Sequence, residues 1–557
     1  MLTRYTIGVD FGTLSGRAVL LNAESGEAVA SSSMAYPHGV MEHALPNGTP
    51  LPPQFALQHP RDYIEVLAWV VRDVMKQADV SPEAIMGLGI DFTTCTLLPI
   101  REDGTPLCFE AEYEGEPHAY VKLWKHHGGQ AEAERTTEVA KEMGEGWLAE
   151  YGGRVSSEWA IPKIMETLNR APGVYEAAAR FIDAGDWLSL LLTGQETHAA
   201  GFASLKFFWG YDRGYPSPAF FKALDPRLEH LIGTKIPSEV QTVEEIAGVL
   251  SVRGAEMTGL REGTPLALPI PDAVAAMPAL NITKPGVLMA VVGTSGVQLI
   301  HAKESLSIAG ICGQIRNGVV PGLYTYEAGQ SAVGDIFDWF VRHCVPASYY
   351  EAAHQENCNI HQYLRARAQK MRAGESGLLA LDWLNGNRSL LQDADVSGMI
   401  LGLTITTRPE EIYRALIEST AYGVRAIVDA FEDGGLSIGE IRASGGIAKK
   451  DPMMMQIYAD VLGRELAVID SDQSAAHGAA IYAAVAAGLY PTLESASEAL
   501  SVKEKTVYRP IAENGRIYSR LYAEYKRLYD YFGRGENNVM KRLRRIAEGE
   551  GNHEIGT

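Results

Sequence analysis

The chain has 557 residues, of which 46% are hydrophobic and 21% are charged. This composition indicates a folded globular protein, and the length exceeds what one hydrophobic core usually serves, so we expect two large domains with a ligand cleft between them. The formal net charge of −20 disfavours nucleic acid and anionic membranes as partners, because both are bound through basic surfaces.

The cysteines and the apolar segments bear on the location of the protein. Five cysteines are scattered without paired metal spacing, and their odd number is a poor disulfide framework. The N-terminal segment has no apolar signal core, and no window of the sequence reaches the roughly 20 apolar residues of a membrane span. We therefore expect a protein of the reducing cytoplasm with no membrane partner.

The first predicted element is a β-hairpin near the N-terminus. Residues 5–10 form an apolar strand, the glycine-bounded segment 12–16 a tight turn, and residues 17–22 the returning strand. Further along the chain, the stretch 156–193 is predicted to be mainly helical. Glycine, proline and mixed charge over 251–265 then mark the expected domain boundary.

A second hairpin of the same kind follows about half a chain after the first. Residues 287–292 form another apolar strand, 293–296 a glycine-bounded turn, and 297–300 the return. Two matching hairpins at this separation predict a duplicated domain.

The remaining predicted elements lie in the second half of the chain. Apolar residues at helical spacing behind an acidic first turn predict a long amphipathic helix over 410–431. The others are a strand at 441–444, a helix at 452–462, an alanine-rich helix for close packing at 475–489 and a packing helix in the tail at 517–545.

The turn of the first hairpin has the residue types of a phosphate site. Asp10 ends a buried strand, Gly12 lets the backbone approach an anion closely, and the hydroxyls of Thr13 and Ser15 offer hydrogen-bond donors. A carboxylate at this position can hold a magnesium ion, a hard cation that prefers oxygen ligands. The alternative is that the segment is merely a hairpin turn.

Two later glycine turns add to the case for a nucleotide. The segment from Gly293 to Gly296 supplies a second turn of phosphate size, and Gly445 and Gly446 join a strand to a helix where an adenosine could lie against backbone. Alone, the last turn is equally a plain strand-to-helix connection. Neither a P-loop nor a G-x-G-x-x-G dinucleotide turn is present, which disfavours those two classes of nucleotide-binding protein.

In this order, the three turns resemble the FGGY carbohydrate kinases of the actin-like ATPase superfamily, and the resemblance covers essentially the whole chain. It implies an α/β fold of two ribonuclease-H-like domains flanking a central cleft. The strings that resemble the branch acting on L-ribulose are Trp124-Lys-His-His127, Ser156-Ser-Glu-Trp159, Tyr326-Glu-Ala-Gly-Gln-Ser-Ala-Val-Gly-Asp335, Trp383-Leu-Asn-Gly-Asn-Arg388 and Tyr529-Asp-Tyr-Phe-Gly-Arg534.

The resemblance also divides the chain by role. It implies an N-terminal domain over 1–252 that mainly binds sugar, and a C-terminal domain over 253–557 that mainly binds nucleotide and carries a helical tail from about residue 503.

A catalytic base is implied at Asp272, which follows Pro271 just after the expected boundary. Phosphoryl transfer to a sugar hydroxyl needs a group that accepts the hydroxyl proton beside the γ-phosphate. The alternative for Asp272 is helix capping, because aspartate before an alanine-rich run is ordinary N-cap chemistry.

The same resemblance implies the ligands of both substrates. For the sugar they are Thr94, Lys206, Asp272 and Glu327, each of which also has a plain structural explanation. For the nucleotide they are Gly12, Thr13, Ser15, Arg17, Gly293, Thr294, Ser295, Gly334, Asp338, Gly445, Gly446 and Asp451, with Asp10 as the magnesium ligand.

The implied activity is MgATP-dependent phosphorylation of L-ribulose at its C5 hydroxyl to L-ribulose 5-phosphate, in the catabolism of L-arabinose. Alternatives are another ketopentose or pentitol, such as xylulose or ribitol, and, more distantly, an actin-like ATPase without sugar chemistry. The expected partners are the ketopentose and MgATP, and a homodimer is left open.

Overall fold

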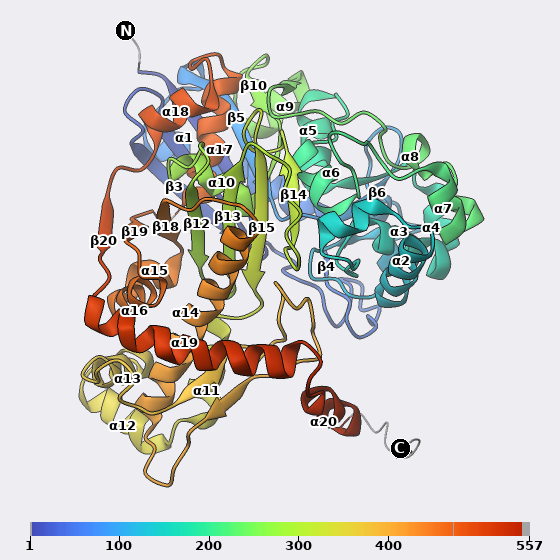
Figure 1. The fold of residues 1–557 in the computed structure, drawn as a ribbon. Coiled ribbons are helices and arrows are strands. Elements are labelled where there is room, and N and C mark those ends of the chain that lie inside the picture. Colours follow the sequence, from blue (N-terminus) through green and yellow to red (C-terminus); the bar gives the residue numbers. More distant parts are fainter. Residues whose placement is uncertain (1–2, 472, 548–557) are drawn as a thin grey trace.

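The computed structural model describes residues 3–471 and 473–547, and two large sheets dominate this part of the chain (Figure 1). In the first sheet the order is β3-β2-β1-β5-β10-β9, with β11 pairing with β5. Its strands are β1 (Tyr5–Phe11), β2 (Ser15–Asn22), β3 (Ala28–Ala35), β5 (Ile85–Phe92), β9 (Ile246–Val249), β10 (Pro265–Ala267) and β11 (Ile270–Pro271).

The second sheet repeats this topology. Its order is β14-β15-β13-β12-β18-β19-β20. Apart from the extra edge strand β14, the two sheets have the same order of pairings. In each sheet the first three strands pair antiparallel, the next two strands are added in parallel, and the last strand pairs antiparallel with its neighbour. The strands are β12 (Val287–Val292), β13 (Gly296–Ala302), β14 (Gly313–Arg316), β15 (Tyr324–Gln330), β18 (Glu440–Ser444), β19 (Leu466–Ile469) and β20 (Lys505–Tyr508). The predicted duplication is present.

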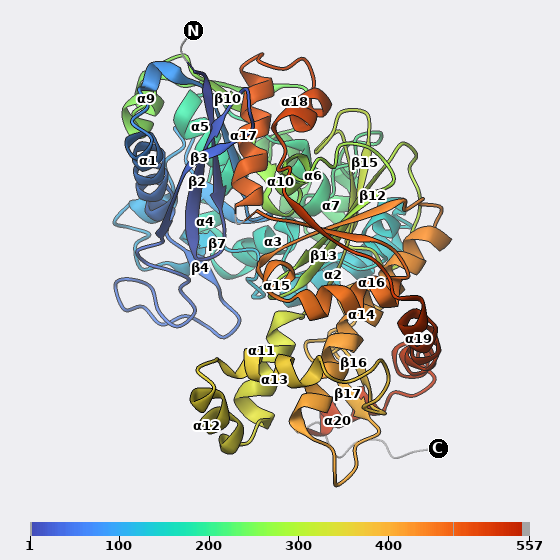
Figure 2. The same cartoon turned by 90° about the vertical axis from the view of Figure 1, so that its left-hand side faces the viewer.

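Helices and two small sheets surround these large sheets (Figure 2). A four-stranded sheet contains β4 (Leu57–Gln58), β6 (Leu97–Ile100), β7 (Val121–Lys122) and β8 (Arg180–Asp183), and a two-stranded sheet contains β16 (Leu379–Leu381) and β17 (Met399–Leu401). The helices of the first half are α1 (Pro60–Gln77), α2 (Gln130–Glu142), α3 (Ala160–Arg170), α4 (Pro172–Ala177), α5 (Ala184–Thr193), α6 (Ala200–Lys206), α7 (Pro218–Leu224), α8 (Leu231–Thr234), α9 (Val252–Thr258) and α10 (Asp272–Ala279). Those of the second half are α11 (Gly334–Cys344), α12 (Ala347–Gln355), α13 (Ile360–Ala368), α14 (Pro409–Asp433), α15 (Gly446–Lys450), α16 (Pro452–Leu462), α17 (Ser474–Ala486), α18 (Leu493–Leu500), α19 (Ala512–Gly533) and α20 (Val539–Ala547).

Helix α17 joins the two halves through very close backbone packing. It comes from the second half of the chain but packs against β1 and β5 of the first sheet. A Cβ atom at Gly8 would lie 1.9 Å from the Ala476 carbonyl oxygen, and one at Gly89 would lie 2.0 Å from the Ala479 carbonyl oxygen. Only glycine permits this approach, which explains the alanine-rich sequence of the helix.

Most predicted elements agree with the structure, and two differ. Both hairpins and the helices predicted over 410–431, 452–462 and 475–489 are present within a few residues of their predicted bounds. The stretch 156–193 also contains the strand β8, and the tail forms two helices, α19 and α20, with a break after Gly533.

The pairing of β9 with β10 concerns the boundary between the two domains. Strands β9 and β10 pair antiparallel, so a division between residues 252 and 253 would separate two neighbours in one sheet. A division between Ala279 and Val287 keeps both large sheets whole.

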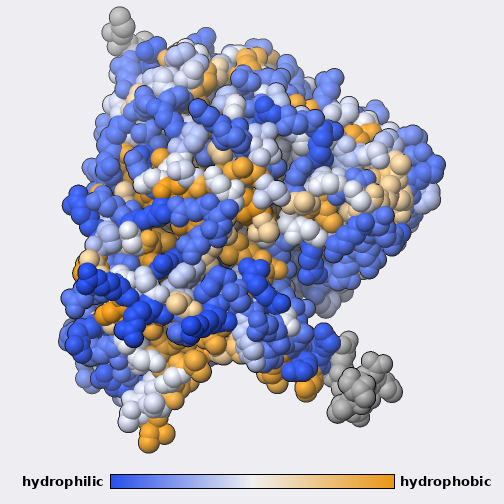
Figure 3. Space-filling view, viewed as in Figure 1, coloured by the Kyte–Doolittle hydropathy of each residue, from blue (hydrophilic) through white to orange (hydrophobic). Residues whose placement is uncertain are grey.

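The surface seen in Figure 3 is mostly hydrophilic, with small apolar patches scattered over it. This agrees with the strongly acidic composition. Within the described residues, no helix combines the length and apolarity that crossing a membrane requires.

Candidate active site

A cavity of about 680 Å³ in the second half of the chain brings together six of the residues predicted to bind nucleotide. These are Gly293, Thr294, Gly334, Asp338, Gly446 and Asp451. Sequence reasoning missed the lining residues Asn359, His361, Gln362, Arg365 and Tyr413, which come from α13, its N-cap and α14, because nothing in their spacing marks them as neighbours of the glycine turns.

Backbone contacts build the glycine-lined side of this cavity. The Gly293 amide donates to the Ser295 carbonyl at 3.1 Å, and the Gly334 amide donates to the Gly293 carbonyl at 3.0 Å. A Cβ atom at Gly334 would lie 2.9 Å from that same Gly293 oxygen, so a side chain there would force the N-terminus of α11 away from the turn. The turn and the start of α11 are therefore held together as one unit.

The first hairpin turn is also closed by a backbone hydrogen bond but lies outside the residues that line this cavity. The Gly12 amide donates to the Ser15 carbonyl at 3.1 Å, three residues on, whereas the bond in the second turn joins residues two apart. Two neighbours hold Thr13: the Gln58 amide group donates to its carbonyl at 2.8 Å, and the Trp124 indole donates to its hydroxyl at 3.1 Å. Sequence reasoning quoted Trp124 in a characteristic string but gave it no role.

Three carboxylates gather at the carboxyl ends of neighbouring parallel strands. Asp10 on β1 is in register with Asp91 on β5, and Asp272 directly follows β11, which also pairs with β5. Burial is the main cause that raises the pKa of Asp91 well above its usual range, and the charge of Asp10 adds to it. Arg17 lies 3.5 Å from Asp10 and partly offsets the excess negative charge.

The surroundings of Asp272 do not match those of a capping residue. Helix α10 begins at Asp272 itself, its N-cap is Pro271, and within the described residues the aspartate oxygen accepts from the adjacent Ala273 amide, at 2.7 Å, and from no amide further along the helix. The pKa of Asp272 is raised to about 7, mainly by burial and also by the nearby charges of Asp10 and Glu327, while the Ala273 amide is among the groups that oppose them. A carboxylate with this pKa can accept a proton near neutral pH.

Of the other predicted sugar ligands, Glu327 lies close enough to Asp272 for its charge to raise the pKa of Asp272, although the two residues come from different halves of the chain. Glu327, buried on β15, accepts a hydrogen bond from Arg388 at 3.1 Å, and this pair contributes to the electrostatics of Asp272. The amino group of Lys206 lies 5.6 Å from the centre of the Trp159 ring. Thr94 is half-buried in the turn that follows β5. Arg388 was also missed, although it ends one of the characteristic strings.

Other predicted nucleotide ligands have structural contacts as well. Asp451 caps α16 by accepting from the Met454 amide at 3.0 Å, and it pairs with Arg365 at 2.9 Å. Asp338 pairs with Arg342 one turn along α11, at 3.0 Å. Ser295 and Gly445 each adjoin a residue of the cavity wall without lining it themselves.

Comparison with known proteins identifies the family to which the chain belongs. The model of the FGGY family of carbohydrate kinases, N-terminal domain, matches residues 5–277, and that of its C-terminal domain matches residues 288–487. The chain therefore belongs to the FGGY family of carbohydrate kinases. It is a carbohydrate kinase whose substrates are a sugar and ATP.

Curated relatives extend over almost the whole chain. A ribulokinase from Geobacillus thermodenitrificans is 48% identical over 550 residues, covering 98% of this chain and 97% of its own length. A ribulokinase from Mycolicibacterium smegmatis is 42% identical over 547 residues, covering 97% and 96%.

Solved structures confirm the predicted fold class. A xylulose kinase from Rhodospirillum rubrum superposes with a TM-score of 0.76 at 22% identity, over 94% of this chain and 98% of its own. A gluconate kinase from Lactobacillus acidophilus superposes with a TM-score of 0.78 at 18% identity, over 96% and 99%.

Proposed function

We propose that this carbohydrate kinase transfers the γ-phosphoryl group of MgATP to the C5 hydroxyl of L-ribulose in the cytoplasm. Several curated relatives named ribulokinase, at 46% to 48% identity over nearly the whole chain, support this substrate. The observation that carries the proposal is the position of Asp272 among charged groups from both halves of the chain, beside Asp10 on one side and the Glu327–Arg388 pair on the other.

In this proposal Asp272 is the catalytic base. As the terminal hydroxyl oxygen of the sugar forms its bond to the γ-phosphorus, the bond from phosphorus to the β,γ-bridging oxygen breaks, and the hydroxyl proton passes to the Asp272 carboxylate. A positioned general base contributes roughly 10²- to 10⁴-fold to the rate. The pKa of about 7 leaves a large share of Asp272 ionised at neutral pH while keeping it basic enough to accept the proton.

The sugar lies between the two halves. Glu327, held in place by Arg388, accepts hydrogen bonds from sugar hydroxyls. Lys206 and Thr94 donate hydrogen bonds to oxygen atoms of the sugar. The Trp159 ring next to Lys206 offers an apolar surface for the C–H face of a small sugar.

The nucleotide occupies the 680 Å³ cavity, with its adenosine against Gly446 and Asp451. Its phosphates extend past the turn at Gly293 toward the turn at Gly12, whose backbone amides suit anions. Asp10 and the neighbouring Asp91 supply carboxyl oxygens side by side, the ligand type that a hard divalent cation prefers. Magnesium bound there would offset the charge of the phosphates.

The test is a coupled assay of ADP release with a panel of substrates: L-ribulose, D-ribulose, both xyluloses, and ribitol. We expect the highest kcat/KM for L-ribulose and little ADP release without sugar. A preference for xylulose or ribitol would reassign the substrate within the family. ATP turnover that is insensitive to every sugar would instead support an ATPase without sugar chemistry.

A further inference from the structure

The turn that carries Thr94 adopts a conformation that its own sequence disfavours. It connects β5 to β6, and Cys95, next to Thr94, has a φ of 62°, in the left-handed region that residues with a side chain rarely adopt. A strained, non-glycine conformation persists only when neighbouring groups hold it. The neighbours of this turn therefore decide where Thr94 points.

Two buried ionisable residues hold the backbone of Cys95, one at its amide and one at its carbonyl. Its amide donates to an Asp183 carboxylate oxygen at 3.0 Å, and its carbonyl accepts from the Lys163 amino group at 2.8 Å. Both side chains are fully buried. The amino group of Lys163 also donates to the Leu123 carbonyl at 2.8 Å, which fixes its direction.

Hydroxyl groups complete this arrangement and leave Thr94 as the accessible residue of the turn. The hydroxyls of Thr93 and Thr96 lie 2.7 Å apart and are buried, and the Ala184 amide donates to the Thr96 carbonyl at 2.8 Å. Thr94 is half-buried. A rigid turn that presents one partly accessible hydroxyl is a suitable support for a substrate ligand.

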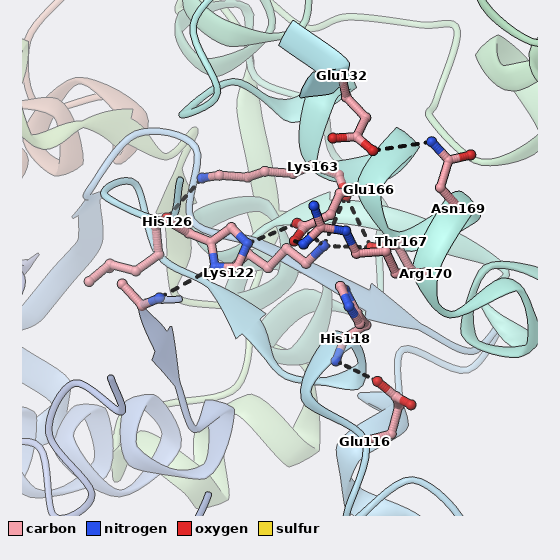
Figure 4. Close-up of polar contacts among 12 residues, drawn as sticks. Glu116, His118, Lys122, His126, Glu132, Lys163, Glu166, Thr167, Asn169 and Arg170 are labelled. Carbon is pink, nitrogen blue, oxygen red and sulfur yellow. Dashed lines mark hydrogen bonds and ion pairs between the residues drawn. The ribbon is translucent and has the colours of Figure 1, made fainter. Parts of the chain in front are cut away.

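A second buried lysine nearby has different partners, which makes it a natural control. The amino group of Lys122 donates to Glu166 at 2.7 Å, to the Thr167 hydroxyl at 2.7 Å and to the Lys163 carbonyl at 3.0 Å, and no bond from it to the turn at Thr94 is among the described contacts. Figure 4 shows Lys122, His126 and Glu166 joined by dashed contacts, with the amino group of Lys163 directed away from Glu166.

We propose that Lys163 is a positioning residue for the sugar: with Asp183, it fixes the backbone at Cys95 so that the Thr94 hydroxyl reaches the ketopentose. The inference rests on the proposed function, because it takes Thr94 as a sugar ligand. Burying an amino group costs solvation free energy, which an apolar side chain of similar length at the same place in α3 would avoid. Holding the turn accounts for a lysine there.

The experiment compares Lys163→Met with Lys122→Met, since each substitution removes one fully buried amino group of the same chemistry. Steady-state kinetics with L-ribulose and with MgATP are measured on both, and thermal unfolding confirms that each is folded. For Lys163→Met we expect the KM for L-ribulose to rise about tenfold and the KM for MgATP to change less than about twofold. For Lys122→Met we expect no selective rise of the KM for L-ribulose over the KM for MgATP, even if the variant is less stable than the wild type.

A double-mutant cycle shows whether Lys163 acts through Thr94. If it does, adding Lys163→Met to Thr94→Ala raises the KM for L-ribulose little further, because the hydroxyl that the turn presents is already gone. Independent, multiplicative effects would overturn the proposal, and so would equal KM changes in the two lysine variants.

Two further results keep the inference separable from the proposed function. Should Lys163→Met fail to fold, Asp183→Ala replaces it: this change removes the acceptor of the Cys95 amide, and an unchanged KM for L-ribulose in that variant refutes the positioning role. A wild-type enzyme that phosphorylates no ketopentose refutes the proposed function and this inference with it. A wild-type enzyme that phosphorylates L-ribulose while Thr94→Ala has a normal KM refutes this inference alone.

Discussion

Replacing Asp272 by asparagine should abolish activity and at the same time stabilise the protein at alkaline pH. The substitution keeps the size of the side chain but removes its negative charge and its ability to accept a proton. We expect kcat to fall roughly 10²- to 10⁴-fold, the usual contribution of a general base. The gain in stability follows from burial and from the charges of Asp10 and Glu327, which together disfavour the ionised form of Asp272.

The size of the expected stabilisation follows from the pKa of Asp272, which is shifted from 3.8 to about 7 in the folded protein. The folded protein binds the proton of Asp272 more tightly than the unfolded chain does, so the stability falls as the pH rises from about 4 to about 7, and the full cost applies above that. At about 1.4 kcal/mol per pKa unit, Asp272 costs about 4 kcal/mol at pH 8, where it is ionised in the folded protein, and about 2 kcal/mol at pH 5, where it must take up a proton on folding. These are upper bounds, because water reaches one side of the half-buried carboxylate.

The assay is urea unfolding of the wild type and of Asp272→Asn at pH 5 and pH 8, without nucleotide or divalent cations. Asp433→Asn, which changes an exposed carboxylate at the end of α14, serves as the control. We expect Asp272→Asn to be stabilised by about 2 kcal/mol more at pH 8 than at pH 5. We expect the control to show no such difference between the two pH values.

Two outcomes would refute the reasoning. A stabilisation by Asp272→Asn that is equal at both pH values would mean that the pKa of Asp272 is not raised in the folded protein. A variant that retains wild-type kcat would show that Asp272 is not the base, whatever its pKa.

Other predictions follow from the same geometry. The kcat/KM of the wild type should fall about tenfold per pH unit below the pKa of the base, near 7, and a flat pH–rate profile between pH 5 and 7 would contradict this. Glu327→Gln should raise the KM for L-ribulose while leaving that for MgATP unchanged, and the opposite split would move Glu327 to the nucleotide. Gly334→Val should weaken nucleotide binding, because its Cβ would meet the Gly293 carbonyl at 2.9 Å; isothermal titration measures the expected rise in the Kd for ADP. Gly89→Ala should destabilise the protein by about 1–3 kcal/mol or more by displacing α17, and an unchanged urea midpoint would refute this.

Local sequence signals predicted the repeated unit well. The two hairpins were recognisable because a strand, a glycine turn and a returning strand occupy a short contiguous segment, and their pattern depends on neighbouring residues alone. The alanine-rich segment predicted close packing, and α17 shows the reason, since Gly89 faces its backbone directly. The role of Asp272 could be proposed only from a family resemblance, because an aspartate before a helix looks the same as an N-cap.

The sequence by itself therefore determined the local elements, each of which depends on residues close together in the chain. The likeness of the two hairpins indicated the duplication, and the class of chemistry followed from the three glycine turns together with the family resemblance. The tertiary structure alone decided which side chains meet. Glu327 and Arg388 lie 61 positions apart, Cys95 and Lys163 lie 68 apart, and their contacts form only after the sheets and α3 have packed. Spacing in the sequence carries no information about such contacts, since burial and packing of the whole chain bring them together.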